Sequence, residues 1–383
     1  MTKLKIIIPV LVCCGLQTAT IFAKIETAKA DEPIVYKVSN GTIEIKPRMK
    51  YELLISTHVL RAAEDHHKLF VPWAKKMRKS LTKKTLREAM ILGGYTWQLC
   101  SLLQEYDGPD TIDGIVDFVR KDNDKAIMKW ASYTYNQRFI NALGLGPDQF
   151  PTWYADFLKR YYEEGFGEQW SSEHKQLVYE DAKSVVKELE SLDFSSTYFM
   201  GKITGRKFSG STKIILYPSS FSRPQHAYGF SEGGNKVTVY KIGSGKAGVL
   251  GSIFHELLHP LIRGWQQSER MKEPIAKLAG EPLFKASWEQ NGKGSYDYPN
   301  GWIDELMVHA ISNYIQYKAG FLKERKVRDY AYSNYEKALC DAIFDKYDSF
   351  DNIDDFIFYA INHIKVVGKG KKAHFKYIEE NEE

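Results

Sequence analysis

Apolar and polar residues follow two different spacings along this chain. Near the amino terminus, IVYKVSNGTIEIKP (residues 34–47) places apolar residues at alternate positions on both sides of Asn40-Gly41. Alternation is the pattern of a half-buried strand, and Asn-Gly is favoured in two-residue hairpin turns. From Met49 to about Leu192, apolar residues recur at helical spacing, interrupted by glycine and proline breaks. The pattern predicts a β-hairpin followed by a mostly helical region.

Alternating segments return in the second half of the chain. TKIILYP (212–218), HAYGF (226–230) and KVTVYKI (236–242) are rich in β-branched and aromatic residues and are separated by serine, proline and glycine turns. Two segments with helical spacing follow, GSIFHELLHPLIRG (251–264) and NGWIDELMVHAISNYIQY (300–317). We therefore expect an α+β protein, with a predominantly helical N-terminal region followed by a region with a small sheet and further helices.

The first 30 residues have the pattern of an export signal. MTKLK supplies positive charge, Ile6–Leu16 an apolar core, and Ala28-Lys29-Ala30 a small-x-small cleavage site. Pro9 and the polar residues after the apolar core make the segment a poor membrane span. An uncleaved anchor, or lipidation at Cys13 or Cys14, is the alternative. The signal predicts cleavage near Ala30 and a mature chain that is secreted, periplasmic or cell-surface, with no stable membrane insertion.

Composition refines this organisation. We expect a signal peptide at 1–30, a hairpin plus mostly helical region at 31–195 and, at 196–383, the region with the small sheet and further helices. The formal charge of +5 falls to +2 once the signal, which carries a net +3, is removed. So small a charge gives no reason to expect a nucleic-acid partner. The mature chain keeps Cys100 and Cys340, which could form a disulfide or remain two buried thiols.

The segment His255-Glu256-Leu257-Leu258-His259 carries the most specific chemistry. Residues four apart lie on one face of a helix, so His255 and His259 can direct two imidazole nitrogens at one metal ion. Glu256 can reach a water on that metal without being a ligand, and can accept its proton during attack on a carbonyl. Apolar residues fill the rest of this helix, as expected of a helix buried beneath a site. The spacing predicts metal-assisted hydrolysis.

These residues resemble the zincin metallopeptidases, whose HExxH helix supplies two zinc ligands and the general base. The resemblance covers this helix, the β segments before it and a helix after it. Pro260 departs from the family pattern because it directly follows the second histidine. Proline removes a backbone donor and clashes with the preceding turn, so we expect the helix to kink or end there and to move His259 away from α geometry.

A catalytic zinc usually has three protein ligands and one open position. The segment after His259 has no further histidine of the metzincin kind, whereas residues 300–317 place Glu305 and His309 one turn apart on an apolar helix. By analogy with the glutamate-zincins, Glu305 would be the third ligand. His309 would then hydrogen-bond within the site or donate to the developing oxyanion. The alternative exchanges the two, with His309 as ligand and Glu305 orienting it.

The resemblance implies one Zn²⁺ ion and a peptide or protein substrate bound along an exposed sheet edge, for which residues 226–242 are the candidate. The sequence also resembles an uncharacterised bacterial family of exported, zincin-like proteins, the domain of unknown function 4932 family. We expect an exported zinc-dependent metallopeptidase with Glu256 as general base. Two alternatives remain open: a non-catalytic envelope binding protein, and a zinc hydrolase acting on a non-peptide amide or ester.

Overall fold

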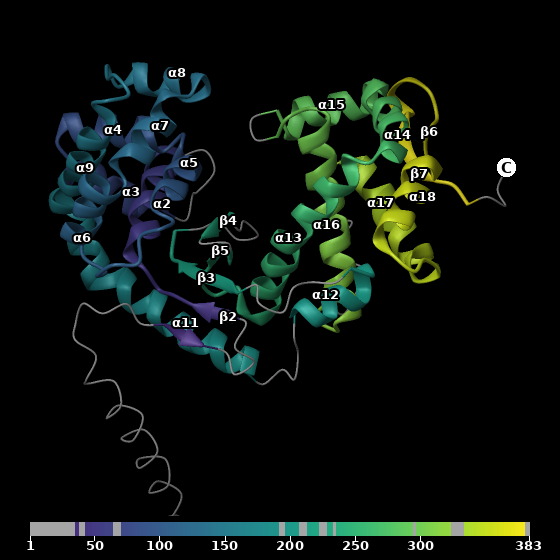
Figure 1. The fold of residues 1–383 in the computed structure, drawn as a ribbon, viewed down its shortest axis with the longest axis horizontal. Helices are drawn as coiled ribbons and strands as arrows, with labels where there is room; N and C mark the ends of the chain where they lie inside the picture. The colour runs from purple at the N-terminus through teal and green to yellow at the C-terminus, as the bar shows by residue number, and fades with distance from the viewer. Residues whose placement is uncertain are drawn as a thin grey trace, which may run out of the picture. The chain divides into compact units, whose positions relative to one another are not determined.

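The computed structural model describes residues 35–37, 43–63, 70–190, 196–206, 213–221, 228–232, 235–293, 296–322 and 333–379. The predicted signal, residues 1–30, and the Asn40-Gly41 turn lie outside this part. Two compact units make up the chain, one containing Tyr106–Lys159 and the other containing Val35–Glu105 and Arg160–Glu383. The protein is α+β and rich in helix, as expected (Figure 1).

Helices account for most of the described residues. In the first part of the chain they are α2 Met49–Ala62, α3 Val71–Ser80, α4 Lys83–Leu92, α5 Thr96–Leu102, α6 Ile112–Asp117, α7 Asp124–Ser132, α8 Thr134–Ala142, α9 Phe150–Tyr161, α10 Gly167–Gln169, α11 Lys175–Glu190 and α12 Ser196–Thr204. In the second part they are α13 Gly245–Gln266, α14 Glu269–Gly280, α15 Pro282–Asn291, α16 Asn300–Lys318, α17 Asn334–Lys346 and α18 Ile353–His363. Short π-helical segments are η2 Phe118–Asp122, η3 Tyr162–Phe166 and η4 Trp170–His174, and 3₁₀ segments are η6 Tyr347–Ser349 and η7 Gly370–Lys372.

The strands form a five-stranded sheet and a two-stranded sheet. The larger has the order β1-β2-β3-β5-β4, built from β1 Tyr36–Lys37, β2 Ile43–Ile45, β3 Ile214–Ser219, β4 Tyr228–Glu232 and β5 Asn235–Lys241. β2, β3 and β5 are parallel, whereas β1 and β4 run antiparallel to their neighbours. The smaller sheet pairs β6 Ile364–Val367 with β7 His374–Tyr377. The three predicted β segments are therefore confirmed.

The predicted hairpin is confirmed by its pairing. β1 and β2 are antiparallel, with Tyr36 opposite Ile45 and Lys37 opposite Glu44. This register is symmetric about Asn40-Gly41, the position that the dipeptide indicated. Ile43 and Ile45 are buried and join a core shared by the sheet, α11, α13 and α16 to α18. The alternation read from the sequence thus places β2 in the sheet that leads to α13.

Helix α13 runs without interruption from Gly245 to Gln266 and passes through Pro260. The expectation that the helix ends at Pro260, or takes His259 out of α geometry, is therefore wrong. Proline removes only the bond that residue 260 would donate to the Glu256 carbonyl, at a cost of about 3 kcal/mol. Pro260 itself faces solvent, while Leu257, Leu258 and Ile262 on both sides of it are buried in the core. Packing of this apolar face offsets the lost bond.

Contacts from α11 fix the start of α13. The Asp181 carboxylate accepts a hydrogen bond from the Gly243 backbone N–H at 2.7 Å, and Glu188 accepts one from the Lys246 N–H at 2.8 Å. Carboxylates are stabilising at a helix N-terminus because they satisfy free N–H groups and oppose the positive end of the helix dipole. Tyr240, on β5, donates to the same Asp181 at 2.9 Å. The sheet and α11 together therefore set where α13 begins.

Helices α13 and α16 lie side by side (Figure 1). Their approach is close at Gly251, where a Cβ atom would lie 2.8 Å from the Gln316 side-chain oxygen. Ser312 of α16 donates a hydrogen bond to the Gly251 carbonyl at 3.2 Å. Gly251 precedes His255 by one turn of α13, and Ser312 follows Glu305 by about two turns of α16. The small residue therefore sets the helix separation at which the candidate site is built.

One other sequence question is settled, that of the two cysteines. Cys100 and Cys340 are both buried and are not joined in a disulfide. Among the helices that the structure describes, none combines the length and the apolar character that a membrane crossing requires.

A buried histidine predicts a pH-dependent loss of stability. The Nδ1 atom of His174 lies 3.0 Å from the Ser220 hydroxyl. Burial lowers the pKa of His174 to about 4. The unfolded chain gains this proton near pH 6.5, so stability is complete above that pH and is lost as the pH falls toward 4. We expect wild type to lose about 2–3 kcal/mol more unfolding free energy than His174→Gln between pH 7 and pH 4.5, measured by urea denaturation.

The matched control is His374→Gln, because the His374 side chain is exposed. This variant should show the same pH dependence as wild type. A wild-type profile that coincides with that of His174→Gln would contradict the prediction.

Candidate metal centre

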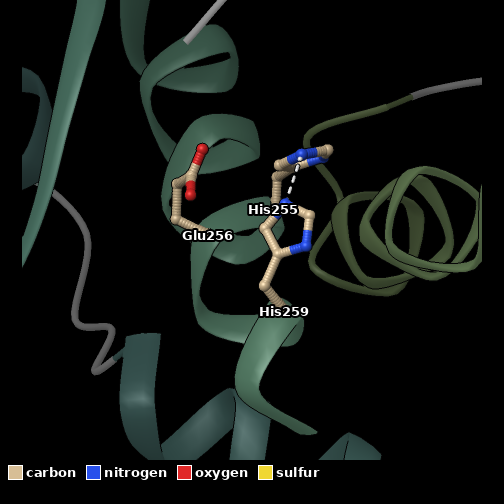
Figure 2. A group of neighbouring side chains, drawn as sticks. All are labelled: His255, Glu256 and His259. Atoms are coloured by element: carbon tan, nitrogen blue, oxygen red, sulfur yellow. Dashed lines mark hydrogen bonds between the residues drawn. The ribbon is translucent and has the colours of Figure 1, made fainter. Parts of the chain in front are cut away.

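His255 and His259 meet on one face of α13, as their spacing predicts. Their Nε2 atoms lie 3.2 Å apart, and the ring planes cross at 83° (Figure 2). Both side chains are mostly buried, with exposed fractions of 19% and 16%. His255, Glu256 and His259 each offer a ligand atom, and these atoms lie within 4.8 Å of one another. This helix turn is therefore a candidate metal-binding group.

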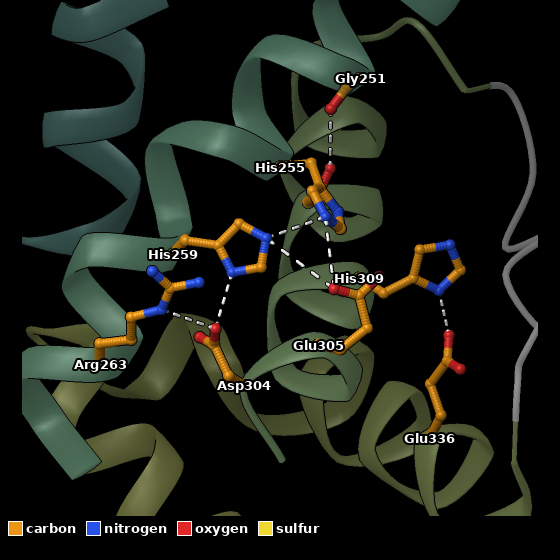
Figure 3. A network of polar contacts seen from close by, with 9 residues as sticks. Gly251, His255, His259, Arg263, Asp304, Glu305, His309 and Glu336 are labelled. Atoms are coloured by element: carbon orange, nitrogen blue, oxygen red, sulfur yellow. Dashed lines mark hydrogen bonds and ion pairs between the residues drawn. The ribbon is translucent and has the colours of Figure 1, made fainter. Parts of the chain in front are cut away.

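The structure brings Glu305 of α16 to the same two imidazoles. Its Oε2 atom lies 3.7 Å from the His255 Nε2 and 3.8 Å from the His259 Nε2 (Figure 3). Only 7% of the Glu305 side chain is exposed, so water contributes little to satisfying its carboxylate. Two nitrogens from one helix and one oxygen from another thus converge on a common point.

The hydrogen bond that His259 makes through Nδ1 determines whether its Nε2 atom carries a proton or a lone pair. The His259 Nδ1 lies 2.8 Å from the Asp304 carboxylate, so Nδ1 carries the proton and donates it. In a neutral imidazole the other nitrogen then has a lone pair. That lone pair faces the Glu305 oxygen, which is itself an acceptor. Converging acceptors in a buried place are costly unless a proton or a cation lies between them.

The surroundings of His255 favour its neutral form. Burial lowers the pKa of His255 well below its usual range, and the nearby His259 and His309 lower it further. Burial also acts to lower the pKa of His259, but the hydrogen bond and charge of Asp304, together with the charges of Glu256 and Glu305, raise it. The pKa of Glu305 is raised by burial, although His259 opposes this. The neutral His255 keeps a lone pair available to a metal ion.

Glu256 occupies a different position from the three converging groups. Its side chain is partly buried and extends to one side of the two rings instead of between them (Figure 2). A carboxylate set back from the ligands in this way can reach a water held by them without binding the metal itself. The role of Glu256 as general base stays a prediction.

Asp304 and Arg263 belong to the site and were missed by the sequence reasoning. Asp304 is buried, and its Oδ2 accepts hydrogen bonds from the His259 Nδ1 and from the Arg263 Nε at 3.1 Å. Carboxylates that accept from the outer nitrogen of a metal-binding histidine fix its tautomer and orientation. The available signals were that Asp304 directly precedes Glu305 and that Arg263 follows His259 by one helical turn.

Replacing Asp304 with asparagine tests this orienting role. The amide has nearly the same shape but no charge, so the His259 tautomer is held less firmly. We expect the affinity for Zn²⁺ to fall about 10–100-fold, measured by competition with a chromophoric chelator. Asp345→Asn, on α17, serves as the control and should bind Zn²⁺ as wild type does. An Asp304→Asn affinity equal to that of wild type would contradict the role.

His309 lies near the converging groups but is turned toward another partner. Its Nδ1 is hydrogen-bonded to the Glu336 carboxylate, and its ring centroid is 6.4 Å from that of His255 (Figure 3). Glu336 is fully buried. Burial acts to lower the pKa of His309, but Glu336 outweighs it and raises that pKa. His309 is therefore a neighbour of the site that favours its protonated form.

Tyr296 also reaches the site, through a hydrogen bond to the Glu305 carboxylate. Its backbone oxygen accepts from the Trp288 indole N–H at 2.8 Å, which anchors the segment before α16. The chain has 24 tyrosines, and no spacing in the sequence distinguishes this one from the others. Only the fold could identify it.

Comparison with known proteins adds no relative to this description. The sequence matches no family model, and neither a curated protein nor a solved structure matches the chain. The chemistry must therefore be argued from the residues themselves.

Proposed function

We propose that the protein is a zinc-dependent hydrolase, and most specifically an exported metallopeptidase. The observation that carries the proposal is the convergence of the His255 Nε2, the His259 Nε2 and the Glu305 Oε2, with separations of 3.2, 3.7 and 3.8 Å. Ligands placed tetrahedrally at about 2.0–2.1 Å from Zn²⁺ lie roughly 3.3 Å from one another. The three atoms fit such a site with small adjustments, and a fourth position stays open for water.

The residues divide the work of hydrolysis. A bound Zn²⁺ would lower the pKa of a coordinated water toward 7 and polarise the substrate carbonyl. Glu256 accepts a proton from the attacking water and then returns it to the leaving amine, as a general base and acid. Asp304, held by Arg263, keeps the His259 Nε2 directed at the centre. His309 favours its protonated form and lies close enough to His255 to serve as a donor to the developing oxyanion.

The sheet supports a peptide as the substrate. β4 pairs with β5 alone among the described strands, so its other side is an edge of the sheet in this part of the chain. β5 leads to α13 through only Ile242, Gly243 and Ser244. An extended peptide can add to a sheet edge as a further strand, through backbone hydrogen bonds. We propose that the substrate binds along β4. Residues 1–30 as an export signal would place this activity outside the cytoplasm.

Metal content and hydrolysis together test the proposal. Purified residues 31–383 should contain about one equivalent of zinc by elemental analysis and should cleave members of a peptide library, with activity lost in a chelator and restored by Zn²⁺. Cleavage of small esters or amides without peptide cleavage would assign a different hydrolase. Bound metal without any hydrolysis would favour a structural site in a binding protein. Absence of bound metal after incubation with Zn²⁺ would refute the proposal.

A further inference from the structure

A pocket of about 220 Å³ lies against the last turn of α13, within the same unit as the metal centre. It is lined by Arg206, Gly264, Trp265, Ser268, Arg270 and Asp354. These residues come from the end of α12, the end of α13, the start of α14 and the start of α18. One ordered water needs only about 10–15 Å³, so the volume is that of a small molecule.

Gly264 keeps part of this pocket open. It lies inside α13 and is not among the glycines with positive φ, so its backbone conformation suits any residue. A Cβ atom at Gly264 would meet nothing within 4 Å. Glycine inside a helix costs about 0.5–1 kcal/mol relative to alanine. Neither the backbone nor a neighbour requires glycine here, whereas a side chain would enter the space beside Trp265.

The charges around the pocket are of both signs, and each has a partner. Arg270 lies over the Phe358 ring, with its guanidinium carbon 3.9 Å from the ring centroid. Arg206 pairs with Asp354, and Arg270 pairs with Asp355 at 2.5 Å, with about half of each arginine side chain exposed. Exposed ion pairs contribute about 0–1 kcal/mol, so a ligand can exchange with them at little cost. In the part of the chain that the structure describes, the Trp265 indole N–H and the Asp354 Oδ1 are buried without a hydrogen-bond partner. The two guanidinium groups and the Asp354 carboxylate give the pocket both donors and an acceptor.

These features select a class of ligand. A simple anion would lie against the Asp354 carboxylate, and a simple cation would lie against two guanidinium groups. A zwitterion satisfies both sets of charges. The start of α14 adds free backbone N–H groups, and the Ser268 side chain makes no capping bond to that helix.

We propose that this pocket binds a free α-amino acid. Its ammonium group contacts Asp354, its carboxylate contacts Arg270 and the start of α14, and its side chain packs on the Trp265 ring. Arg206 turns away from Asp354 to admit the ammonium group. This binding requires neither a metal ion nor hydrolysis.

Calorimetric titration of residues 31–383 tests the charge requirement. The probes are L-alanine, L-leucine, L-phenylalanine and L-glutamate, followed by the N-acetyl and amide forms of the best binder. We expect saturable binding by at least one amino acid, weakened about tenfold or more when either charge is removed. Failure of all four to bind at millimolar concentrations would overturn the proposal. Equal binding of the N-acetyl form would also overturn it, because the site would then be one for anions.

Matched glycine variants locate the site. Gly264→Leu fills the pocket and should abolish binding, whereas Gly280→Leu should bind as wild type does. Gly280 is also an exposed helical glycine where a Cβ would meet nothing within 4 Å, but it lies outside the pocket. Circular dichroism checks that both variants fold.

Asp354→Asn should weaken binding about tenfold or more. Unchanged affinity in Gly264→Leu would place the ligand elsewhere and refute the assignment, and chelator treatment should leave the affinity unchanged.

Discussion

Replacing Glu256 with glutamine is expected to remove peptide hydrolysis while the metal content stays at the wild-type level. Glutamine has nearly the same size and shape as glutamate but cannot accept the proton of the attacking water. Positioned general acid–base groups contribute about 10²–10⁴-fold to rate, so kcat/KM should fall by that factor. The Glu256 side chain extends to one side of the two imidazole rings, and the proposed ligands are His255, His259 and Glu305, so the metal should be retained (Figure 2). Elemental analysis and a peptide-cleavage assay on the same preparation measure both quantities.

Glu289→Gln is the matched control, because Glu289 is an exposed glutamate on α15. It removes the same charge from a position that the mechanism does not use, and its kcat/KM should equal that of wild type. Two results would contradict the role of Glu256. Full activity in Glu256→Gln would show that another group accepts the proton. Loss of the metal together with activity would show that Glu256 is a ligand.

Local pattern was enough for the features that depend on neighbouring residues. The Asn40-Gly41 dipeptide predicted a hairpin, and the antiparallel pairing of Tyr36 with Ile45 agrees with it. The spacing of His255 and His259 likewise predicted that their rings meet on one face of a helix. Each of these inferences needed only the geometry of one element.

Features that depend on the packing of separate helices were harder to predict from the sequence. Asp304 reaches His259 only because α13 and α16 approach closely at Gly251, and helix period alone does not give that separation. The pocket beside Trp265 gathers residues from three separate parts of the sequence, at Arg206, at Gly264 to Arg270 and at Asp354. Pro260 gave an error of the other kind. The rule that proline breaks a helix predicted an end to the helix there, but the helix continues because Leu258 and Ile262 are buried in the core. Tertiary packing decided all three outcomes.

Glu305→Gln is expected to cause the largest loss of metal binding of any change outside α13. The substitution preserves the volume of a side chain that is 7% exposed, but it removes the negative charge that faces the Nε2 atoms of the two imidazoles. Loss of a group that only orients a ligand costs about 10–100-fold in metal affinity, so loss of a direct ligand should exceed 100-fold. His309→Gln should keep the metal, because the His309 Nδ1 is engaged by Glu336. Loss of the metal in His309→Gln, together with metal retention in Glu305→Gln, would make His309 the third ligand.

Thermal unfolding provides a second measure of the difference in metal binding between Glu305→Gln and His309→Gln. A ligand that binds only the folded chain stabilises it by about 2.7 kcal/mol at 100 times its Kd. Added Zn²⁺ should therefore raise the Tm of wild type and of His309→Gln, and should leave that of Glu305→Gln nearly unchanged. In the absence of metal, Glu305→Gln should be at least as stable as wild type, because it no longer holds a buried carboxylate against the acceptor atom of His259. A metal-free variant that is much less stable than wild type would instead give Glu305 a structural role, in which Tyr296 and the two histidines, and not a metal ion, satisfy its charge.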